Sequence, residues 1–499
     1  MIGRRELLLG GASALAGCVA RIPTAGGDAD LRAVAARLAR AAPADRAGAL
    51  RRIDAARLSP EGRILHAALL PGAEADAALS RFAWGADGRP YAVTHRAGAY
   101  RAAARGEEAA RAVEADTERL RADAARGVIA PDFLIDETIA AVEAAIRTAA
   151  DDPPLTQALR RQFDALRELR ARASGEAGTW RLPDGEAWYA QALQLQLGAQ
   201  ADPREAHAQA LRRCRDLQAE ADALLRAQGL TQGDVAARLR ALARDERHLF
   251  ADSAEGKAAA VAFMNDRLAR MRPLLAGAID GADDAPARVV LLPAAQEADG
   301  AGGRRQGSDY LVDLGAIRRR SRWTLPSVVF HELIPGHVLQ AHYQGDAILP
   351  ALQLRYAAGY SEGWATYAEQ LADEAGAYAD DPLGRIGYVQ WTLFRLARVV
   401  ADTGLHAMRW SRARAVEEMR TLQGDSIAFV RIEDDVARMA AQPGAYAAQG
   451  LAAMHIAELR ERMRRSVRGF DLPRFHAAVL RRGPLAPPGL DQAAGAAFT

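Results

Sequence analysis

The sequence is poor in several residue classes, and each scarcity excludes a class of protein. Its 499 residues contain 2 cysteines, Cys18 and Cys214, which excludes a disulfide-rich secreted fold. Lysine occurs once, at Lys257, and 65 basic residues stand against 63 acidic ones, so the formal net charge is only +2. Because the arginines alternate with acidic residues instead of forming a basic stripe, we expect no nucleic-acid partner.

The N-terminus carries a short apolar run, too short to span a membrane. This run, Leu7–Ala16, follows Arg4 and Arg5 and is far shorter than the ~20 residues that a transmembrane helix needs. It is typical of the apolar region of a secretion signal, and the arginine pair resembles a twin-arginine export signal. The four residues Leu-Ala-Gly-Cys that end at Cys18 resemble a bacterial lipobox, in which the cysteine carries the lipid.

These signals together predict an exported lipoprotein. We expect residues 1–17 to be a signal peptide, Cys18 to be lipidated and residues 18–30 to be a linker. The mature protein would then be a periplasmic or cell-envelope protein that is anchored to a membrane through its lipid. The alternative is an ordinary cleaved signal with an incidental cysteine. Cys214 is the only other cysteine, so no internal disulfide is expected.

Most of the remaining chain has the residue spacing of amphipathic helices. Apolar residues recur every three or four positions among arginine and glutamate, and proline- or glycine-containing breaks separate the segments. Clear examples are Leu31–Ala41, Ala103–Arg126, Leu155–Ala173 and Glu205–Leu225.

Strand signals are few and lie close together in the sequence. They occur at Val289–Leu292 and Asp309–Leu314, on either side of a loop that contains Gly302 and Gly303. We therefore predict a mainly α, large two-lobed fold with a small β-sheet next to the active-site cleft. The expected parts are a helical N-terminal region, 31–285, and a C-terminal region, 286–499, that carries the chemistry within one continuous fold.

A histidine cluster follows the second strand signal. Three of the 10 histidines, His331, His337 and His342, fall within one short segment, and residues 331–337 read His-Glu-Leu-Ile-Pro-Gly-His. In the usual zinc hydrolase helix, His-Glu-x-x-His places two imidazoles one turn apart on one metal ion, and the glutamate acts as a base. Here the second histidine is six residues from the first.

The six-residue spacing does not suit a straight helix. At about 100° per residue, His337 would be rotated by roughly 120° from His331. Pro335 and Gly336 lie between them and permit a bulge or a helix end that returns His337 to the metal. His342 is the alternative second ligand, because it returns to the same face, but it lies about 16 Å further along the helix axis.

A third protein ligand is expected from the next helix. Glu362 begins the segment Glu-Gly-Trp-Ala-Thr-Tyr-Ala-Glu, which ends at Glu369. Two imidazoles and one carboxylate, with water in the fourth position, form a common catalytic zinc site. Glu369 lies on the same helical face and is expected to accept a hydrogen bond from an imidazole. The alternative is that these residues are ordinary solvated or buried side chains.

These motifs resemble those of a large bacterial family, domain of unknown function 885. Its signature is similar to His-Glu-x-x-Pro-Gly-His-x-x-Gln, here 331–340, followed by Glu-Gly-Trp-Ala-x-Tyr-x-Glu, here 362–369. A third segment, Asp402–Trp410, resembles the family's Asp-Thr-Gly-x-His element. The resemblance covers most of the mature chain. It implies a helical fold similar to that of thimet oligopeptidase and carboxypeptidase Taq, with zinc in a deep cleft, and it implies no particular substrate.

The chain departs from the family pattern near its C-terminus. A Pro-Gly-Gln-Ala-x-x-Tyr-x-x-Gly element is typical of the family, but Ala445 stands at the glutamine position and Gln449 at the tyrosine position. If that tyrosine stabilises the oxyanion, another donor must replace it. The candidates for this role are Tyr310, His406, Arg438 and Tyr446.

The sequence thus favours a zinc-dependent hydrolase, first of all a peptidase. His331, His337 and Glu362 would hold Zn²⁺, and Glu332 would act as general base. The substrate would be a peptide or another amide, aligned along the strand edge at Tyr310–Leu314. One alternative is a catalytically degenerate envelope lipoprotein that binds metal or substrate, and another is an envelope-assembly protein without metal.

Overall fold

The computed structural model describes residue 31 and residues 35–297, 302–345, 349–427 and 430–499. The predicted signal peptide, the lipidation site Cys18 and the whole of the predicted linker lie outside the described residues. Within the described part, helices dominate and the three strands are short, so the predicted mainly α fold is confirmed. None of the described helices combines the length and the apolar character that a membrane span requires.

The described part of the N-terminal half contains helices and, apart from two isolated β-bridges, no strand. Several of them begin at proline, which suits the first helical turn because its fixed φ is helical and its missing N–H has no partner there in any case. The helices are α2 (Pro43–Arg51), α3 (Pro60–Leu79), α4 (Gly106–Ala125), α5 (Asp132–Thr148), α6 (Pro153–Arg170), α7 (Gly185–Leu197), α8 (Pro203–Ala227), α9 (Val235–Ala243) and α10 (Ala254–Leu274).

The C-terminal half contains the sheet and the remaining helices. Its strands are β1 (Arg288–Leu291), β2 (Gly303–Gln306) and β3 (Asp309–Val312). Its helices are α11 (Leu325–Glu332), α12 (His337–Gln344), α13 (Ala351–Tyr356), α14 (Tyr360–Glu374), α15 (Pro382–His406), α16 (Arg412–Gln423), α17 (Ile432–Ala441), α18 (Ala445–Ser466), α19 (Leu472–Leu480) and α20 (Pro487–Ala497).

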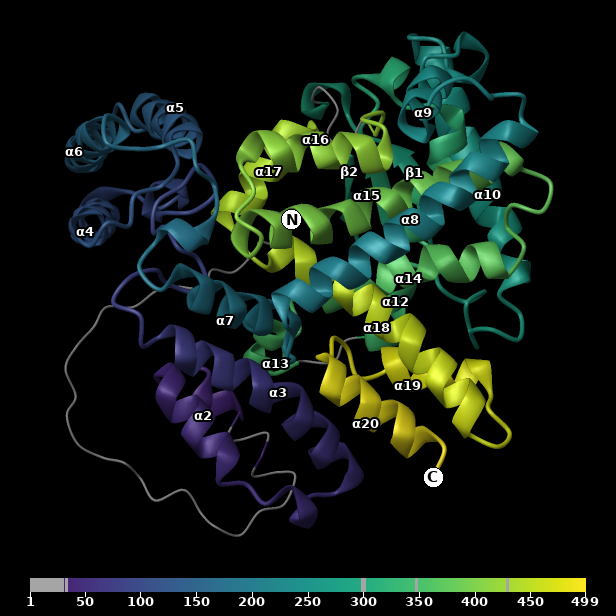
Figure 1. The fold of residues 1–499 in the computed structure, drawn as a ribbon, viewed down its shortest axis with the longest axis horizontal. Coiled ribbons are helices and arrows are strands. Elements are labelled where there is room, and N and C mark those ends of the chain that lie inside the picture. Colours follow the sequence, from purple (N-terminus) through teal and green to yellow (C-terminus); the bar gives the residue numbers. More distant parts are fainter. Residues whose placement is uncertain (1–30, 32–34, 298–301, 346–348, 428–429) are drawn as a thin grey trace.

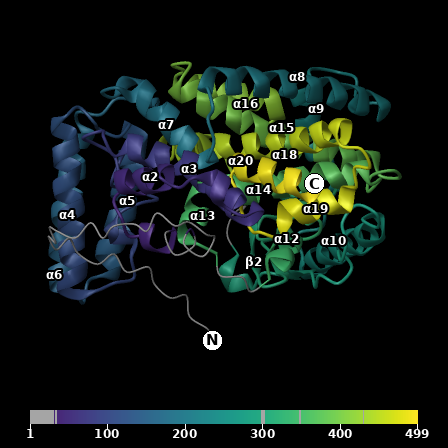
Figure 2. The ribbon, with the colours of Figure 1, turned by 90° about the horizontal axis from the view of Figure 1, so that it is seen from below.

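Helix α15 runs through the middle of the molecule (Figure 1) and packs against α8, α16 and α18. Most of its residues are buried, including the polar side chains of Gln390, Arg398 and Asp402. Helices α4, α5 and α6 form a group at one end of the molecule, as Figure 2 shows from a second side. The main hydrophobic core nevertheless extends from Leu31 to Ala494. The boundary predicted near residue 285 stays a prediction.

The sheet has the order β1-β3-β2, with β1 parallel and β2 antiparallel to β3. Both predicted strands are present, and β2 is an additional strand in what the sequence indicated as a loop. Because β3 pairs on both sides, the predicted peptide-binding edge at Tyr310–Leu314 is wrong: β3 has no free edge. The outer edge of β2 pairs with no other described strand, and all four of its residues are exposed.

Candidate metal centre

A helix break brings the two histidines of the segment 331–337 together. Helix α11 ends at Glu332 and α12 begins at His337, so the predicted interruption at Pro335 and Gly336 is present. Gly336 is required sterically, because a Cβ there would lie 1.8 Å from the carbonyl oxygen of His331. The indole Nε1 of Trp364, on α14, donates to the carbonyl of Pro335 at 3.1 Å and ties the break to that helix.

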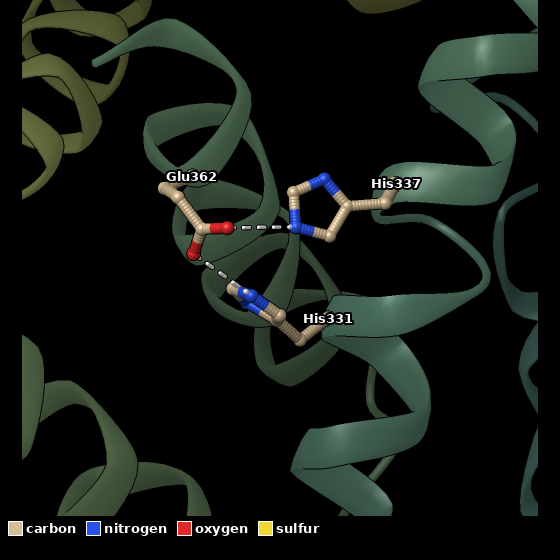
Figure 3. A group of neighbouring side chains, drawn as sticks. All are labelled: His331, His337 and Glu362. Atoms are coloured by element: carbon tan, nitrogen blue, oxygen red, sulfur yellow. Dashed lines mark ion pairs between the residues drawn. The ribbon is translucent and has the colours of Figure 1, made fainter. Parts of the chain in front are cut away.

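Three side chains converge at this break (Figure 3). His331 comes from the end of α11, His337 from the start of α12 and Glu362 from the first turn of α14. Nε2 of each imidazole lies 3.4 Å from an oxygen of Glu362, and one ligand atom from each residue lies within 4.8 Å of the others. His342 is exposed on α12 and outside this group, so the structure favours His337 over the alternative ligand.

The hydrogen bonds of His331 determine which of its nitrogens carries the proton. Nδ1 lies 2.9 Å from Oε1 of Glu369, as expected for a carboxylate that orients an imidazole. Nη2 of Arg395 is also 2.9 Å from both Nδ1 and the same carboxylate oxygen. A guanidinium only donates, so it donates to the carboxylate, and Nδ1–H donates there too. Nε2 of His331 then keeps its lone pair, directed at Glu362.

A similar chain of hydrogen bonds holds His337. The Ser361 hydroxyl donates to Oε1 of Gln340 at 3.0 Å, and its oxygen lies 3.2 Å from Nδ1 of His337. Because the hydroxyl proton is used on Gln340, Nδ1–H of His337 donates to the hydroxyl oxygen. Nε2 of His337 is therefore the unprotonated nitrogen, and it is buried without a hydrogen-bond partner. An orphaned buried lone pair of this kind fits a metal ligand.

The charges in the group match this arrangement. Burial lowers the pKa of His337, so its imidazole is neutral at neutral pH, which is the metal-binding form. Burial alone would lower the pKa of His331, but Glu362 and Glu369 together raise it. Burial alone would raise the pKa of Glu362, but its contacts with both imidazoles outweigh this and keep the carboxyl ionised well below its ordinary range. Two nitrogens and one carboxylate fit a zinc ion with an open fourth position.

Glu332 lies beside the three side chains on a cavity of about 290 Å³. Its carboxylate forms an ion pair with Arg305 of β2, and 21% of its side chain is exposed. The same cavity is lined by His331 and Glu362, by Gly302 and Gly303 next to and within β2, and by residues of α15, α17 and α18. Glu332, the candidate metal site and strand β2 therefore all border one cavity.

The four candidate oxyanion donors are placed very differently. Tyr310, Arg438 and Tyr446 all line the cavity, as does Gln449. The hydroxyl of Tyr310 donates to the Gly302 carbonyl, whereas that of Tyr446 has no hydrogen-bond partner among the described residues. Burial raises the pKa of Tyr446, which keeps its phenol protonated and able to donate.

His406 is a wrong prediction as a site residue. Its Nδ1 accepts from the backbone N–H of Thr179 at 3.1 Å, and its Nε2 lies 3.2 Å from the Met439 carbonyl. Both nitrogens are thus used, and His406 does not line the cavity. Burial lowers its pKa to about 3, so it stays neutral within the core. The Asp402–Trp410 element to which it belongs is structural at this position.

Apart from Glu369, sequence reasoning did not identify the residues that orient the ligands. Ser327 donates to Glu369 and lies four residues before His331, on the same face of α11. Ser361 directly precedes Glu362 and contacts His337. Both serines could have been found from their spacing relative to the ligands. Arg395 could not, because it comes from the middle of α15 and no local pattern marks it.

Comparison with known proteins places most of the chain in one family. The model of a family described as bacterial protein of unknown function (DUF885) matches residues 19–493. A candidate lipoprotein from Colwellia psychrerythraea, whose crystal structure is known, is 23% identical, with a TM-score of 0.74 over 94% of this chain and 91% of that one. A candidate lipoprotein of unknown function from Shewanella oneidensis is 18% identical, with a TM-score of 0.64 over 95% and 93% of the two chains. These identities show a shared fold alone, and no curated protein matches the chain.

Proposed function

This chain belongs to the bacterial protein family of unknown function DUF885, and we propose that it is a zinc-dependent hydrolase that cleaves peptides. The observation that carries the proposal is the buried Nε2 of His337, which has no hydrogen-bond partner and lies 3.4 Å from the Glu362 carboxylate. A structural histidine would normally have both nitrogens satisfied. The expected ligands are His331, His337 and Glu362.

The proposed chemistry divides between the ion and the chain. Zinc in a three-ligand site lowers the pKa of water toward neutrality and polarises a carbonyl group. Glu332, beside the ligands, accepts the proton of the attacking water and delivers it to the leaving nitrogen. Arg305 holds that carboxylate from β2. Tyr446, which lines the same cavity and whose phenol can donate, supplies a hydrogen bond to the developing oxyanion.

Peptides are proposed as substrates because of the strand edge at the cavity. The outer edge of β2 pairs with no other strand in the part of the chain that the structure describes, and Gly303 of β2 lines the cavity. An extended peptide can add to such an edge through main-chain hydrogen bonds. This proposal replaces the edge of β3, which the structure excludes, with that of β2.

We further propose that the protein acts in the cell envelope, exported by its signal peptide and anchored through a lipid on Cys18. The lipobox-like sequence before Cys18 and the candidate lipoproteins among its structural neighbours support this location.

The first experiment is elemental analysis of the purified full-length protein and of four variants. We expect about one zinc per chain, lost in His331→Ala, His337→Ala and Glu362→Gln because each removes one of three ligands. His342→Ala is the matched control, since this exposed histidine lies on α12 outside the site, and it should keep the zinc. Stoichiometric zinc in His337→Ala, or none in the wild-type protein after zinc addition, would contradict the proposal.

A further inference from the structure

The cavity beside the candidate metal site is strongly cationic. Arginines outnumber acids among its described lining residues: Arg96, Arg320, Arg395, Arg398 and Arg438 face only Glu332 and Glu362. Both glutamates are engaged, one with Arg305 and the other with the two imidazoles. The acids of the lining therefore do not neutralise its arginines.

Three of the five arginines have partners within the protein. Arg395 forms an ion pair with Glu369 at 2.9 Å, and Arg398 forms two hydrogen bonds with the buried Asp435, at 2.6 and 2.9 Å. Arg320 donates to the Gly302 carbonyl at 2.8 Å. These contacts hold the three side chains in the wall.

Arg96 and Arg438 differ from the other three. Among the described residues, no carboxylate lies within ion-pair distance of either guanidinium. Burial raises the pKa of the Glu137 carboxyl and both guanidinium groups act to lower it, but Glu137 already pairs with His95 at 3.1 Å. Arg96 is exposed and Arg438 half-buried, so both can reach a bound molecule. They come from distant segments, the α3–α4 connection and α17.

The position of this pair relative to the metal site follows from its neighbours. Arg398 lines the cavity together with Glu362 and Tyr446, and its guanidinium lies 5.0 Å from the centre of the Tyr446 ring. Tyr446 in turn is influenced by both Arg96 and Arg438. Arg398 and Tyr446 thus link the metal site to the arginine pair across a single cavity. A volume of about 290 Å³ suits the end of a substrate rather than a long segment.

We propose that Arg96 and Arg438 bind a carboxylate of the substrate. The enzyme would then select peptides that place a negative charge in the part of the cavity lined by these two arginines. Guanidinium groups recognise carboxylates through paired, charge-assisted hydrogen bonds, which are strengthened in a cavity of low dielectric constant. The carboxylate is either the free C-terminus, as in removal of C-terminal residues, or an acidic side chain near the cleavage site.

This inference rests on the proposed function, but its test does not depend on turnover. The zinc-loaded, full-length Glu332→Gln variant is titrated calorimetrically with three N-acetylated tetrapeptides: tetra-alanine as the free acid, tetra-alanine amide, and an amide whose last residue is glutamate. We expect the free acid to bind about 10- to 100-fold more tightly than the tetra-alanine amide, the range for a hydrogen bond to a charged group. Tighter binding of the glutamate peptide instead supports the same site and identifies an acidic side chain as the source of the carboxylate.

Arginine variants show whether the pair is responsible for that preference. Arg96→Gln and Arg438→Gln, made in the same background, should each reduce the preference, and the double variant should abolish it. Arg111→Gln is the matched control, because Arg111 is exposed on α4, does not line the cavity and changes the net charge equally. Circular dichroism and thermal unfolding establish that each variant is folded.

The possible failures are distinguishable. Equal binding of all three peptides, no binding of the acidic peptides at millimolar concentration, or a preference that survives in the double variant would overturn the inference. If the wild-type protein contains zinc and hydrolyses amide and acid peptides equally fast, the proposed function stands and this inference fails. If a zinc-free protein still binds the acid through Arg96 and Arg438, the arginine site stands and the hydrolase fails.

Discussion

Two histidine-bearing elements of this protein differ in what their imidazole nitrogens contact. At the His331 site, Nε2 of both imidazoles faces the Glu362 carboxylate, and Nε2 of His337 has no hydrogen-bond partner. In the Asp402–Trp410 element, by contrast, both nitrogens of His406 meet backbone groups of distant segments. The difference teaches that an unused lone pair, rather than a histidine-containing motif, distinguishes a candidate site from a structural element.

Asp402 shows the structural role of the second element most clearly. Its carboxylate accepts from the Tyr189 hydroxyl at 2.8 Å and from the backbone N–H of Gly444 at 2.9 Å, with a longer contact to Ala447 at 3.4 Å. Gly444 and Ala447 lie at the start of α18, the helix that presents Tyr446 and Gln449 to the cavity. The second element therefore supports the site from behind without touching the metal ligands.

The sharpest test of the comparison is Glu332→Gln. If the His331 site is catalytic, loss of the general base should lower the rate of peptide hydrolysis about 10²- to 10⁴-fold, while the ligands and the zinc content stay unchanged. The measurement is the initial rate on a fluorogenic peptide library together with elemental analysis. An unchanged rate in the zinc-loaded variant would remove Glu332 from the mechanism.

Asp402→Ala should mainly affect stability. The substitution leaves the Gly444 N–H and the Tyr189 hydroxyl buried without an acceptor. Each such buried donor lowers the free energy of unfolding by about 1–3 kcal/mol. We expect the free energy of unfolding in urea to fall by about 3 kcal/mol and zinc to be retained in the folded protein. Asp402→Asn, which keeps one acceptor oxygen, should lose less. Zinc loss without destabilisation would break the distinction between the two elements.

Glu369→Gln should mainly affect the metal. The amide keeps the shape of the carboxylate but no longer stabilises Nδ1–H of His331 by charge, so zinc affinity should fall about 10- to 100-fold. Competition with a chelator measures this change on the folded variant. Asp402→Asn is the comparison, because it also neutralises a buried carboxylate but touches no proposed ligand. Equal affinities in the two variants would contradict the role given to Glu369.

The smallest expected effect is on the acid sensitivity of His406→Gln. In the unfolded chain His406 binds a proton below about pH 6.5, whereas burial keeps it neutral in the folded state down to a pKa of about 3. Acid therefore favours the unfolded state, and His406 contributes a slope of about 1.4 kcal/mol per pH unit in this window. We expect urea unfolding between pH 4.5 and 6.5 to show a correspondingly shallower slope in the variant. Coincident slopes would contradict the buried, neutral state.

The sequence predicted the helices and the metal-ligand candidates because both depend on local spacing. Pro335 and Gly336 indicated the helix break that brings His331 and His337 together, and the structure contains it. The strand β2 was missed because its residues, Gly-Arg-Arg-Gln, are all exposed and have no apolar alternation. His406 was misinterpreted because its partner, the Thr179 N–H, lies 227 residues away in the chain. Contacts of that range leave no local signal.

The start of α18 also has a consequence for how relatives of this protein are recognised. Tyr446 and Gln449 are three residues apart on one helix, so they project from the same side of it, and both border the cavity. A search that demands a tyrosine at position 449 would discard this chain as inactive. A search that also accepts a tyrosine at position 446, one helical turn earlier, would retain this chain. Such a search treats positions 446 and 449 as alternative positions for one phenol group.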